Sequence, residues 1–307
     1  MSLLTVGSMA FDSIETPFGK SGRIVGGAAT YIVYCTSYFK NESNVISVVG
    51  GDFDKPTLEE LENKGVNFDG LQIKENEKSF FWAGKYHNNM NSRDTLATEL
   101  NVLETFDPIV PDSYQDCEYL MLGNLAPQVQ MSVINQLKNK PKLIVLDTMN
   151  FWMDIALEPL KEVIAKIDVL TINDEEARQL SGEYSLVNAA KKIMEMGPNT
   201  LIIKKGEHGA MLFKEDKMFF CPAILLETVS DPTGAGDTFA GGFIGHLAQT
   251  EDLSFENMKR AIVMGSAMAS FTCEKFGVER ITNLTQDEID ARVNEIIEMS
   301  QFDMELV

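Results

Sequence analysis

The sequence predicts an α/β fold, a doubly wound, mostly parallel sheet flanked by helices, with a small β lid. Short apolar runs that are typical of buried strands recur at 3–6, 45–49, 119–122, 143–147, 168–172 and 201–204. Segments with apolar residues at steps of three and four separate most of these runs, at 127–138, 154–166 and 185–196. Strands that are apolar on both faces and alternate with helices favour a parallel sheet covered by helices.

Two stretches interrupt this alternation, near 11–25 and 71–87. Both alternate around turn-like centres, so we expect short antiparallel strands that form the lid. No repeat or low-complexity linker divides the sequence, so we expect residues 1–307 to form a single domain. Further helical patterns follow at 235–248, 256–273 and 285–299. Thr285 and Glu288 fit a capping box at the start of the last helix.

Composition excludes several classes of function. Lys and Arg number 26 against 46 Asp and Glu, and the net charge of -20 would repel nucleic acid and anionic membranes. The cysteines form no C-x-x-C pair, which argues against a zinc site or a disulfide framework. The chain shows neither a signal-peptide pattern nor a run of about 20 apolar residues. These features predict a cytoplasmic protein without nucleic-acid or membrane partners.

The most informative stretch is "DPTGAGDTFAGGF" at 231–243. It does not fit a dinucleotide fingerprint, which belongs in a first strand-to-helix turn, whereas this stretch lies in the last quarter of the chain. A P-loop at "GKS", 19–21, also fails because Ile14 stands where that motif needs glycine. A helix that begins within "TGAG" fits better, because unpaired backbone N–H groups and the helix dipole attract phosphate there.

Two features inside this helix have separate causes. An acid in the first turn, Asp237, is a routine helix-stabilising residue, but helix stabilisation does not account for the glycines around it. Gly241 and Gly242 lie in the helix interior, where each costs about 1 kcal/mol relative to alanine. We interpret this pair as a place where another element packs closely.

The stretch resembles the C-terminal signature of the ribokinase-like, or PfkB, family of carbohydrate and nucleoside kinases. Further blocks agree with the family in order and spacing: "VGSMAFD" at 6–12, "GG" at 26–27, "NDEE" at 173–176 and "KKGEHGA" at 204–210. The resemblance implies a ribokinase-like fold and an ATP-dependent kinase that uses Mg²⁺. Such an enzyme transfers the γ-phosphate to a hydroxyl of a small molecule.

The resemblance also implies roles for single residues. Asp237 is the expected base, and the backbone N–H groups of residues 234–237 form the anion hole, including those of Gly234, Ala235 and Gly236. A carboxylate of ordinary pKa, about 3.9, would accept the proton late in the reaction. The expected substrate contacts are Asp12, Gly26, Gly27 and Tyr31. The expected ATP contacts are Asn173, Lys204, Gly206 and Gly209.

Metal roles are implied in the same way. Glu176 would hold Mg²⁺ through water, although Asn173 and Glu176 also fit a helix cap. Asp231 would fix the loop by accepting N–H bonds, or lie near a monovalent cation such as K⁺.

The choice of acceptor rests on departures from the family pattern. Tyr31 stands where many sugar kinases carry an Asn, and Phe151 stands where an Arg often binds acids. A sugar acid is therefore disfavoured, unless Arg93 or Arg23 replaces that Arg, and a neutral sugar is favoured. The alternative is a nucleoside kinase of adenosine type, in which Tyr31 or a lid ring stacks on the base. The lid rings are Phe80, Phe81, Trp82 and Tyr86.

The aromatic rings of the lid also fit a simpler role, because ordinary packing of the lid or a homodimer contact through it would account for them. Two further classes of function stay open. A non-catalytic sugar or nucleotide sensor on the same fold would not need a base beside an anion hole. An NAD-dependent enzyme fits the sequence less well.

Overall fold

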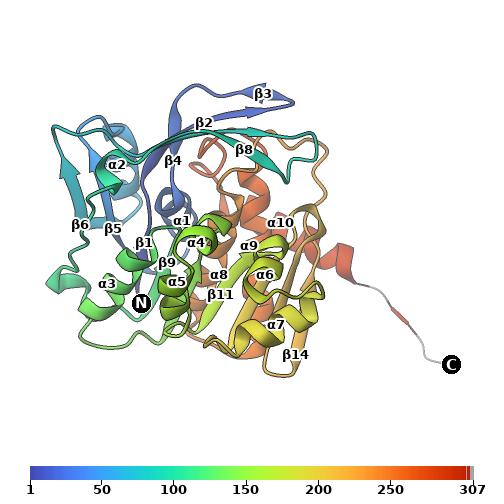
Figure 1. The fold of residues 1–307 in the computed structure, drawn as a ribbon. Coiled ribbons are helices and arrows are strands. Elements are labelled where there is room, and N and C mark those ends of the chain that lie inside the picture. The colour runs from blue at the N-terminus through green and yellow to red at the C-terminus, as the bar shows by residue number, and fades with distance from the viewer. Residues whose placement is uncertain (302, 305–307) are drawn as a thin grey trace.

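The computed structural model describes residues 1–301 and 303–304, and its main element is a nine-stranded sheet (Figure 1). Its parallel strands follow one another across the sheet in the order β6 (Val66–Lys74), β5 (Glu42–Gly50), β1 (Ser2–Val6), β9 (Tyr119–Leu122), β10 (Leu143–Asp147), β11 (Val169–Asn173) and β12 (Thr200–Lys204). Two antiparallel strands, β13 (Ala210–Lys214) and β14 (Lys217–Cys221), complete the other edge. The predicted α/β class and the six predicted strands are confirmed.

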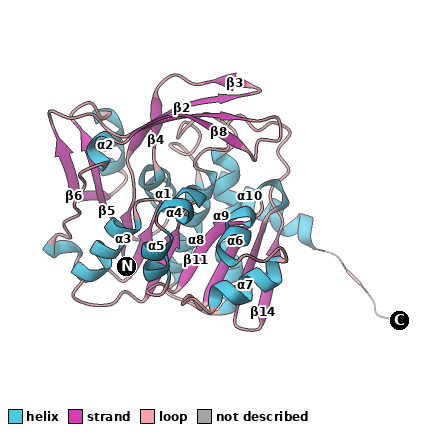
Figure 2. Cartoon of the chain, in the orientation of Figure 1, coloured by secondary structure: helices cyan, strands magenta, loops and turns pink. Residues whose placement is uncertain are grey.

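Helices cover both faces of this sheet (Figure 2). One face packs against α1 (Ala28–Thr36), α8 (Ala235–Thr250) and α9 (Phe255–Thr272), with α10 (Gln286–Ser300) beside them. The other face packs against α3 (Pro127–Gln136), α5 (Leu157–Ile164), α6 (Asp174–Ser181) and α7 (Leu186–Met194). Successive strand residues alternate between the two cores, Leu3 in one and Leu4 in the other. This alternation explains why the strands read as continuous apolar runs.

Smaller elements complete the chain. They are α2 (Lys55–Asn63), α4 (Asn150–Ile155) and the 3₁₀ turns η1 (Asn101–Leu103), η2 (Asp112–Tyr114) and η3 (Gly206–His208). The helix predicted at 154–166 is divided, because Ala156 leaves the helical conformation (φ -144°) between α4 and α5. The capping box of Thr285 and Glu288 at the start of α10 is confirmed. Within the described part of the chain, no helix has the length and apolarity to cross a bilayer.

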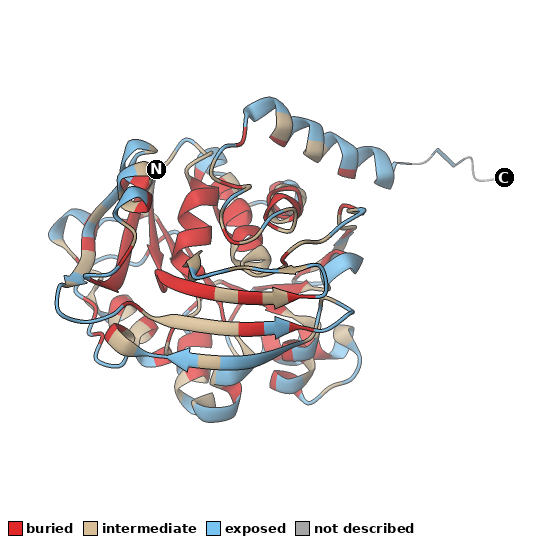
Figure 3. Cartoon of the chain, turned by 90° about the horizontal axis from the view of Figure 1, so that it is seen from above, coloured by how far each residue is buried: buried red, intermediate tan, exposed pale blue. Residues whose placement is uncertain are grey.

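A second sheet, which we call the lid, lies across one end of the main sheet (Figure 1). It consists of β2 (Ala10–Thr16), β3 (Gly19–Lys20), β4 (Ile24–Gly26), β7 (Phe81–Tyr86) and β8 (Arg93–Glu99). The expectation for 71–87 was wrong in part, because residues 71–74 belong to β6 in the main sheet. The strand β8 was not predicted, and it is largely exposed along the free edge of the lid (Figure 3). The pairing of β2 with β7 is parallel, not antiparallel as expected.

The register of the lid defines its inner face, which is the face toward the main sheet. Asp12 on β2 pairs with Trp82 on β7, and Tyr86 on β7 pairs with Arg93 on β8. Paired residues share a face of a sheet, as do residues two apart along a strand. Ile14, which is fully buried, and Asp12 mark this face as the inner one. Asp12, Trp82, Tyr86 and Arg93 therefore all lie on the inner face.

The glycine pair inside α8 is explained by packing, as predicted. A Cβ at Gly242 would lie 2.9 Å from the Cα of Gly265 in α9, so the two helices touch backbone to backbone there. A Cβ at Gly241 would lie 2.9 Å from the Cβ of Cys35 in α1. Both glycines allow α8 to pack closely against α1 and α9, and this packing determines where the start of α8 lies in the fold.

We therefore predict that Gly242→Val lowers the free energy of unfolding by about 1–3 kcal/mol, because the added methyl groups force α8 and α9 apart. The matched control is Gly22→Val, since a Cβ at exposed Gly22 meets nothing within 4 Å. Denaturant unfolding of both variants measures the difference. Equal midpoints for the two variants would contradict close packing of α8.

Candidate active site

Polar side chains gather where three neighbouring parallel strands end. Asp147, Asn173 and Lys204 are the last residues of β10, β11 and β12. Asn173 and Lys204 are paired in the register, and Lys204 contacts Asp147. Open α/β sheets bind ligands at the carboxyl ends of their strands. All three residues therefore lie where such a sheet binds its ligand.

The start of α8 meets this cluster. Gly234, at φ 78°, is the N-cap, and the helix begins at Ala235. A Cβ at Gly234 would lie 2.4 Å from the ring of Tyr31, and a Cβ at Gly236 would lie 3.1 Å from Lys204 Nζ. The glycines therefore let a ring and an ammonium approach the backbone. The Ala235 N–H already donates to the Pro232 carbonyl at 3.2 Å, which closes the turn before the helix.

Asp237 lies in the first turn of α8 and is half-buried. Burial raises the pKa of its carboxyl group, and the Asp147 carboxylate raises it further. Lys204 and Arg93 act on the pKa in the opposite direction without cancelling the effect. The expectation of an ordinary pKa for Asp237 is therefore wrong, because it ignored the neighbours that the fold brings together.

Lys204 forms a buried ion pair with Asp147. Its Nζ donates to both oxygens of Asp147, at 2.9 and 3.1 Å, and the Thr171 hydroxyl donates to the same carboxylate at 3.1 Å. The side chains of Lys204 and Asp147 are 17% and 7% exposed. The ammonium group thus stands between Asp147 and the backbone of Gly236, at the N-terminus of α8.

Asn173 and Glu176 form a reciprocal cap on α6, as their helix-cap interpretation predicted. Asn173 Oδ1 accepts from the Glu176 N–H at 2.8 Å, and Glu176 Oε2 accepts from the Asn173 N–H at 2.7 Å. Burial raises the pKa of Glu176 to about 7, and the Asp147 carboxylate acts in the same direction. Mg²⁺ in phosphate sites typically takes one or two carboxylates, water and phosphate oxygens. The carboxylates of Glu176 and Asp147 fit such a donor set.

The substrate contacts expected near the N-terminus lie between the lid and the strand ends of β10, β11 and β12. Asp12 is 4% exposed, and its carboxylate packs so closely on Gly26 that a Cβ there would lie 1.9 Å from Oδ2. Gly27, at φ 92°, is the N-cap of α1. Burial, followed by the charges of Asp231 and Asp237, raises the pKa of Asp12 to about 7. Asp12 and Asp237, far apart in sequence, therefore lie close enough for the charge of Asp237 to raise the pKa of Asp12.

Tyr31 lies beneath the turn that leads into α8. Its ring packs against Gly234, and its buried hydroxyl has no hydrogen-bond partner among the described residues. Burial raises its pKa well above the ordinary value, and the charges of Asp12 and Asp231 act in the same direction. The tyrosine thus brings a hydroxyl close to the carboxylates of Asp12 and Asp231.

Asp231 fixes the turn before α8, as predicted. Its carboxylate accepts from the Thr233 N–H at 2.9 Å and from the Gly277 N–H at 3.1 Å. The two glycines expected to contact ATP have positive φ angles, 54° at Gly206 and 91° at Gly209. A Cβ at Gly209 would lie 2.0 Å from the Cys221 carbonyl oxygen, and one at Gly206 would lie 2.5 Å from Asn91 Oδ1. Backbone conformation and close approach thus explain both glycines, and their contact with ATP stays a prediction.

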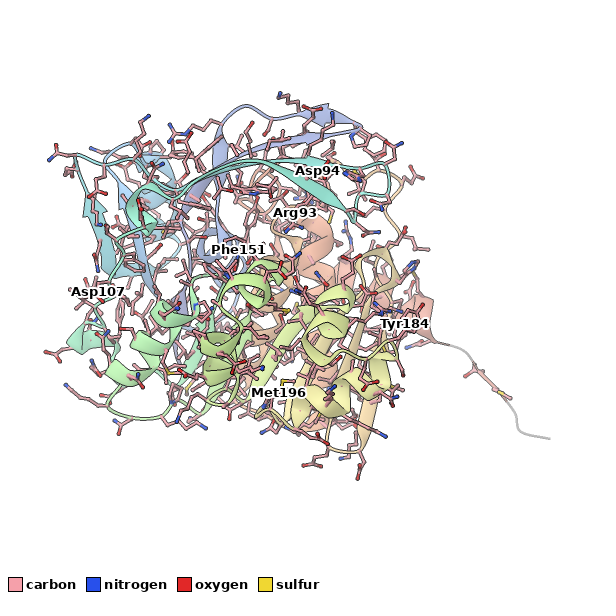
Figure 4. The ribbon with its side chains drawn as sticks, viewed as in Figure 1. Arg93, Asp94, Asp107, Phe151, Tyr184 and Met196 are labelled. Carbon is pink, nitrogen blue, oxygen red and sulfur yellow. The ribbon has the colours of Figure 1, made fainter. Side chains whose placement is uncertain are left out.

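The sequence did not reveal the positions of two lid residues, Arg93 and Tyr86. Arg93 lies between the lid and the elements beneath it (Figure 4), where its charge offsets part of the rise in the pKa values of Asp237 and Glu176. Arg23, the other arginine considered, instead pairs with Asp52. Tyr86 accepts a hydrogen bond from the Thr233 hydroxyl at 3.1 Å. The alternation of Trp82 and Tyr86 along β7 was the available sign that both face inward.

The raised pKa of Asp12 predicts a pH-dependent effect of Asp12→Asn on stability. The folded pKa lies above the unfolded value, so the carboxyl group stabilises the fold below about pH 4. That contribution is lost as pH rises to about 7, where the folded-state group ionises. The melting temperature of Asp12→Asn relative to wild type should therefore be higher at pH 8 than at pH 5, by about 2 °C or more. Thermal unfolding at both pH values measures this.

The control for that experiment is Asp216→Asn, because Asp216 is exposed in the turn between β13 and β14. Its effect should be the same at both pH values. A difference for Asp12→Asn that does not change with pH would contradict a buried, proton-binding Asp12.

Comparison with known proteins finds kinases that resemble this chain in fold and sequence. The family model described as "pfkB family carbohydrate kinase" matches residues 5–284. The cytidine kinase of Thermococcus kodakarensis is 25% identical over 288 residues, which cover 92% of this chain and 99% of that protein. The nucleoside kinase of Methanocaldococcus jannaschii is 26% identical over 301 residues, covering 92% of this chain and 88% of the relative.

A solved structure from E. coli, in complex with ATP and Mg²⁺, superposes with a TM-score of 0.79. It is 19% identical and covers 96% of this chain and 99% of the other, a likeness that shows the fold. The family model spans nearly the whole chain and includes the strand ends, the lid and the start of α8. The chain therefore belongs to the pfkB family of carbohydrate kinases and is an ATP-dependent phosphotransferase.

Proposed function

We propose that this protein transfers the γ-phosphoryl group of ATP to a hydroxyl of a nucleoside, with Asp237 as the base. The observation that carries this proposal is the position of Asp237, at the N-terminus of α8 and near enough to Lys204 and Asp12 for their charges to interact. The sequence favoured a neutral sugar as acceptor. The full-length relatives named for cytidine and nucleosides now favour the nucleoside alternative.

In the proposed reaction, a bond forms between the acceptor oxygen and the γ-phosphorus, and the bond from that phosphorus to the ADP oxygen breaks. Asp237 takes the proton of the acceptor hydroxyl, and its raised pKa makes it a better proton acceptor than an ordinary carboxylate. N–H groups in the first turn of α8, with the helix dipole, stabilise the charge on the transferring group. Lys204 adds a positive charge at the same helix start.

Mg²⁺ bound to the phosphates would neutralise their charge. Glu176 is the carboxylate that we assign to it through water, because one of its oxygens stays outside the α6 cap. Gly206 and Gly209, with Asn173, would line the nucleotide. A monovalent cation near Asp231, a homodimer through the lid and a cytoplasmic location stay predictions from the sequence.

The inner face of the lid supplies a surface for the base of the acceptor. The ring of Trp82 lies over Gly84, where a Cβ would come within 2.0 Å of it. The indole N–H donates to the Thr95 hydroxyl at 3.3 Å, and the Arg93 guanidinium lies 5.7 Å from the ring centroid. These contacts hold the ring in place on the same lid face as Asp12. We assign hydroxyl recognition to Asp12 and base stacking to Trp82.

A neutral sugar remains the second candidate, because Asp12 would recognise sugar hydroxyls in either acceptor and the family model is named for carbohydrates. A panel of nucleosides and neutral sugars, assayed by ADP release, separates the two. Turnover of sugars alone would overturn the nucleoside assignment. A non-catalytic sensor loses its support because the chain belongs to a family of kinases.

We predict that Asp237→Asn lowers kcat about 10²- to 10⁴-fold, because the amide cannot accept the proton. The KM for ATP should change little, since the backbone donors and Lys204 remain. Steady-state kinetics with the best acceptor of the panel measure both constants. Asp174→Asn, at the start of α6 and paired with Arg178, is the matched control and should keep kcat. An unchanged kcat for Asp237→Asn would refute the assignment.

We also predict that Trp82→Ala raises the KM for a nucleoside about 5- to 150-fold, which corresponds to the 1–3 kcal/mol of a base-stacking contact. Trp82→Phe should lose less, because it keeps a ring. Kinetics with a nucleoside and with its free sugar separate stacking from a general lid defect. Equal losses for both acceptors would show that Trp82 does not contact a base.

A further inference from the structure

We propose that Tyr86 and Thr233 are a positioning pair, whose hydrogen bond docks the lid on the turn before α8 and sets the anion hole when acceptor is bound. The inference deepens the proposed function and rests on it. Neither residue needs to touch the reacting atoms. Their role is to connect the part of the lid that holds the acceptor with the backbone that holds the transferring phosphoryl group.

The lid contacts this turn through two strands. Tyr86, on β7, accepts a hydrogen bond from the Thr233 hydroxyl at 3.1 Å. Thr16, on β2, donates its hydroxyl to the Ser230 carbonyl at 3.1 Å. Tyr86 and Thr16 are 6% and 7% exposed, so both contacts are protected from water. Thr233 immediately precedes Gly234, the N-cap of α8, so the lid contacts the chain one residue before the expected anion hole.

The other side of the turn is held by backbone groups that do not belong to the lid. The N–H groups of Ser230 and Asp231 donate to the Cys273 carbonyl, at 2.8 and 3.4 Å. The Asp231 carboxylate accepts from the Gly277 N–H at 3.1 Å. These bonds fix the beginning of the turn to the segment after α9. Thr233 lies nearer the helix and is held by its hydrogen bonds to Asp231 and Tyr86.

The strands β2 and β7 carry the same spacing of functional residues. Asp12 lies four residues before Thr16 on β2, and Trp82 lies four residues before Tyr86 on β7. Asp12 and Trp82 are neighbours in the register, and they are the residues to which we assign the acceptor. Each strand thus carries an acceptor-facing residue at one place and a contact with the turn about 13 Å further on, at the rise of a strand.

Through this arrangement, the pair couples acceptor binding on the lid to the position of the anion hole. An acceptor that holds Asp12 and Trp82 also holds Thr16 and Tyr86, because extended strands paired in a sheet move together. Thr233 is then fixed, and with it the N-terminus of α8. Without acceptor, the lid keeps its hydrogen bonds to the turn but lacks the additional hold at Asp12 and Trp82, so the anion hole is less firmly placed and transfer to water is slow. The pair therefore favours phosphoryl transfer over hydrolysis of ATP to ADP and inorganic phosphate.

The test is a double-mutant cycle of Tyr86→Phe and Thr233→Val. Each single variant should lower kcat for transfer about 2- to 12-fold, the range of one hydrogen bond, with the KM for ATP and the melting temperature unchanged. The double variant should be no slower than the slower single variant, because both remove the same bond. Thr233→Ser, which keeps the hydroxyl, should restore kcat. In the variants without the bond, ADP release without acceptor should become a larger share of the rate with acceptor.

The control is Tyr184→Phe, because Tyr184 is 88% exposed and lies outside the site. An unchanged kcat for Tyr86→Phe, or losses that multiply in the double variant, would overturn the proposal. If kcat falls only together with the melting temperature, the bond is structural and the proposal fails. The cycle can be measured with whichever acceptor is turned over, so a sugar acceptor would refute the nucleoside assignment and still test the coupling.

Discussion

The buried ion pair of Lys204 and Asp147 is the interaction on which the site depends. The carboxylates of Asp147, Glu176 and Asp237 lie close enough for the charge of Asp147 to raise the pKa values of the other two, and Lys204 forms an ion pair with Asp147. Removing one partner of such a pair typically destabilises a fold by about 3–5 kcal/mol, because the other charge is left buried. The same ammonium lies against Gly236, so the group that stabilises the cluster also lies at the start of α8.

The fold assembles this cluster from distant parts of the chain by simple means. Parallel strands place their carboxyl ends at one edge, which gives Asp147, Asn173 and Lys204. Close packing of α8 on its neighbours then brings the helix start, with Asp237, to the same edge. The lid strand β2 adds Asp12. Burial raises the pKa values of Asp12 and Asp237, which is the property that the proposed base requires.

Much of the fold and the start of α8 could be predicted from the sequence, for physical reasons. Strands buried on both faces are continuous apolar runs, and the glycines before Asp237 mark a helix start that other groups approach closely. The lid was harder, because β8 is exposed and polar while residues 71–74 alternate like a lid strand although they lie at the edge of the main sheet. The pKa of Asp237 and the bond from Thr233 to Tyr86 could not be predicted. Both depend on residues that are distant in sequence and meet only in the fold.

The central claim is that burial among charges prepares Asp237 to act as a base. A ¹³C NMR titration of the aspartate carboxyl groups, in the wild type and in Asp237→Asn, tests it most directly. The account predicts that the resonance missing from the variant titrates near neutral pH in the wild type. A missing resonance that titrates near the ordinary value of about 3.9 would contradict it.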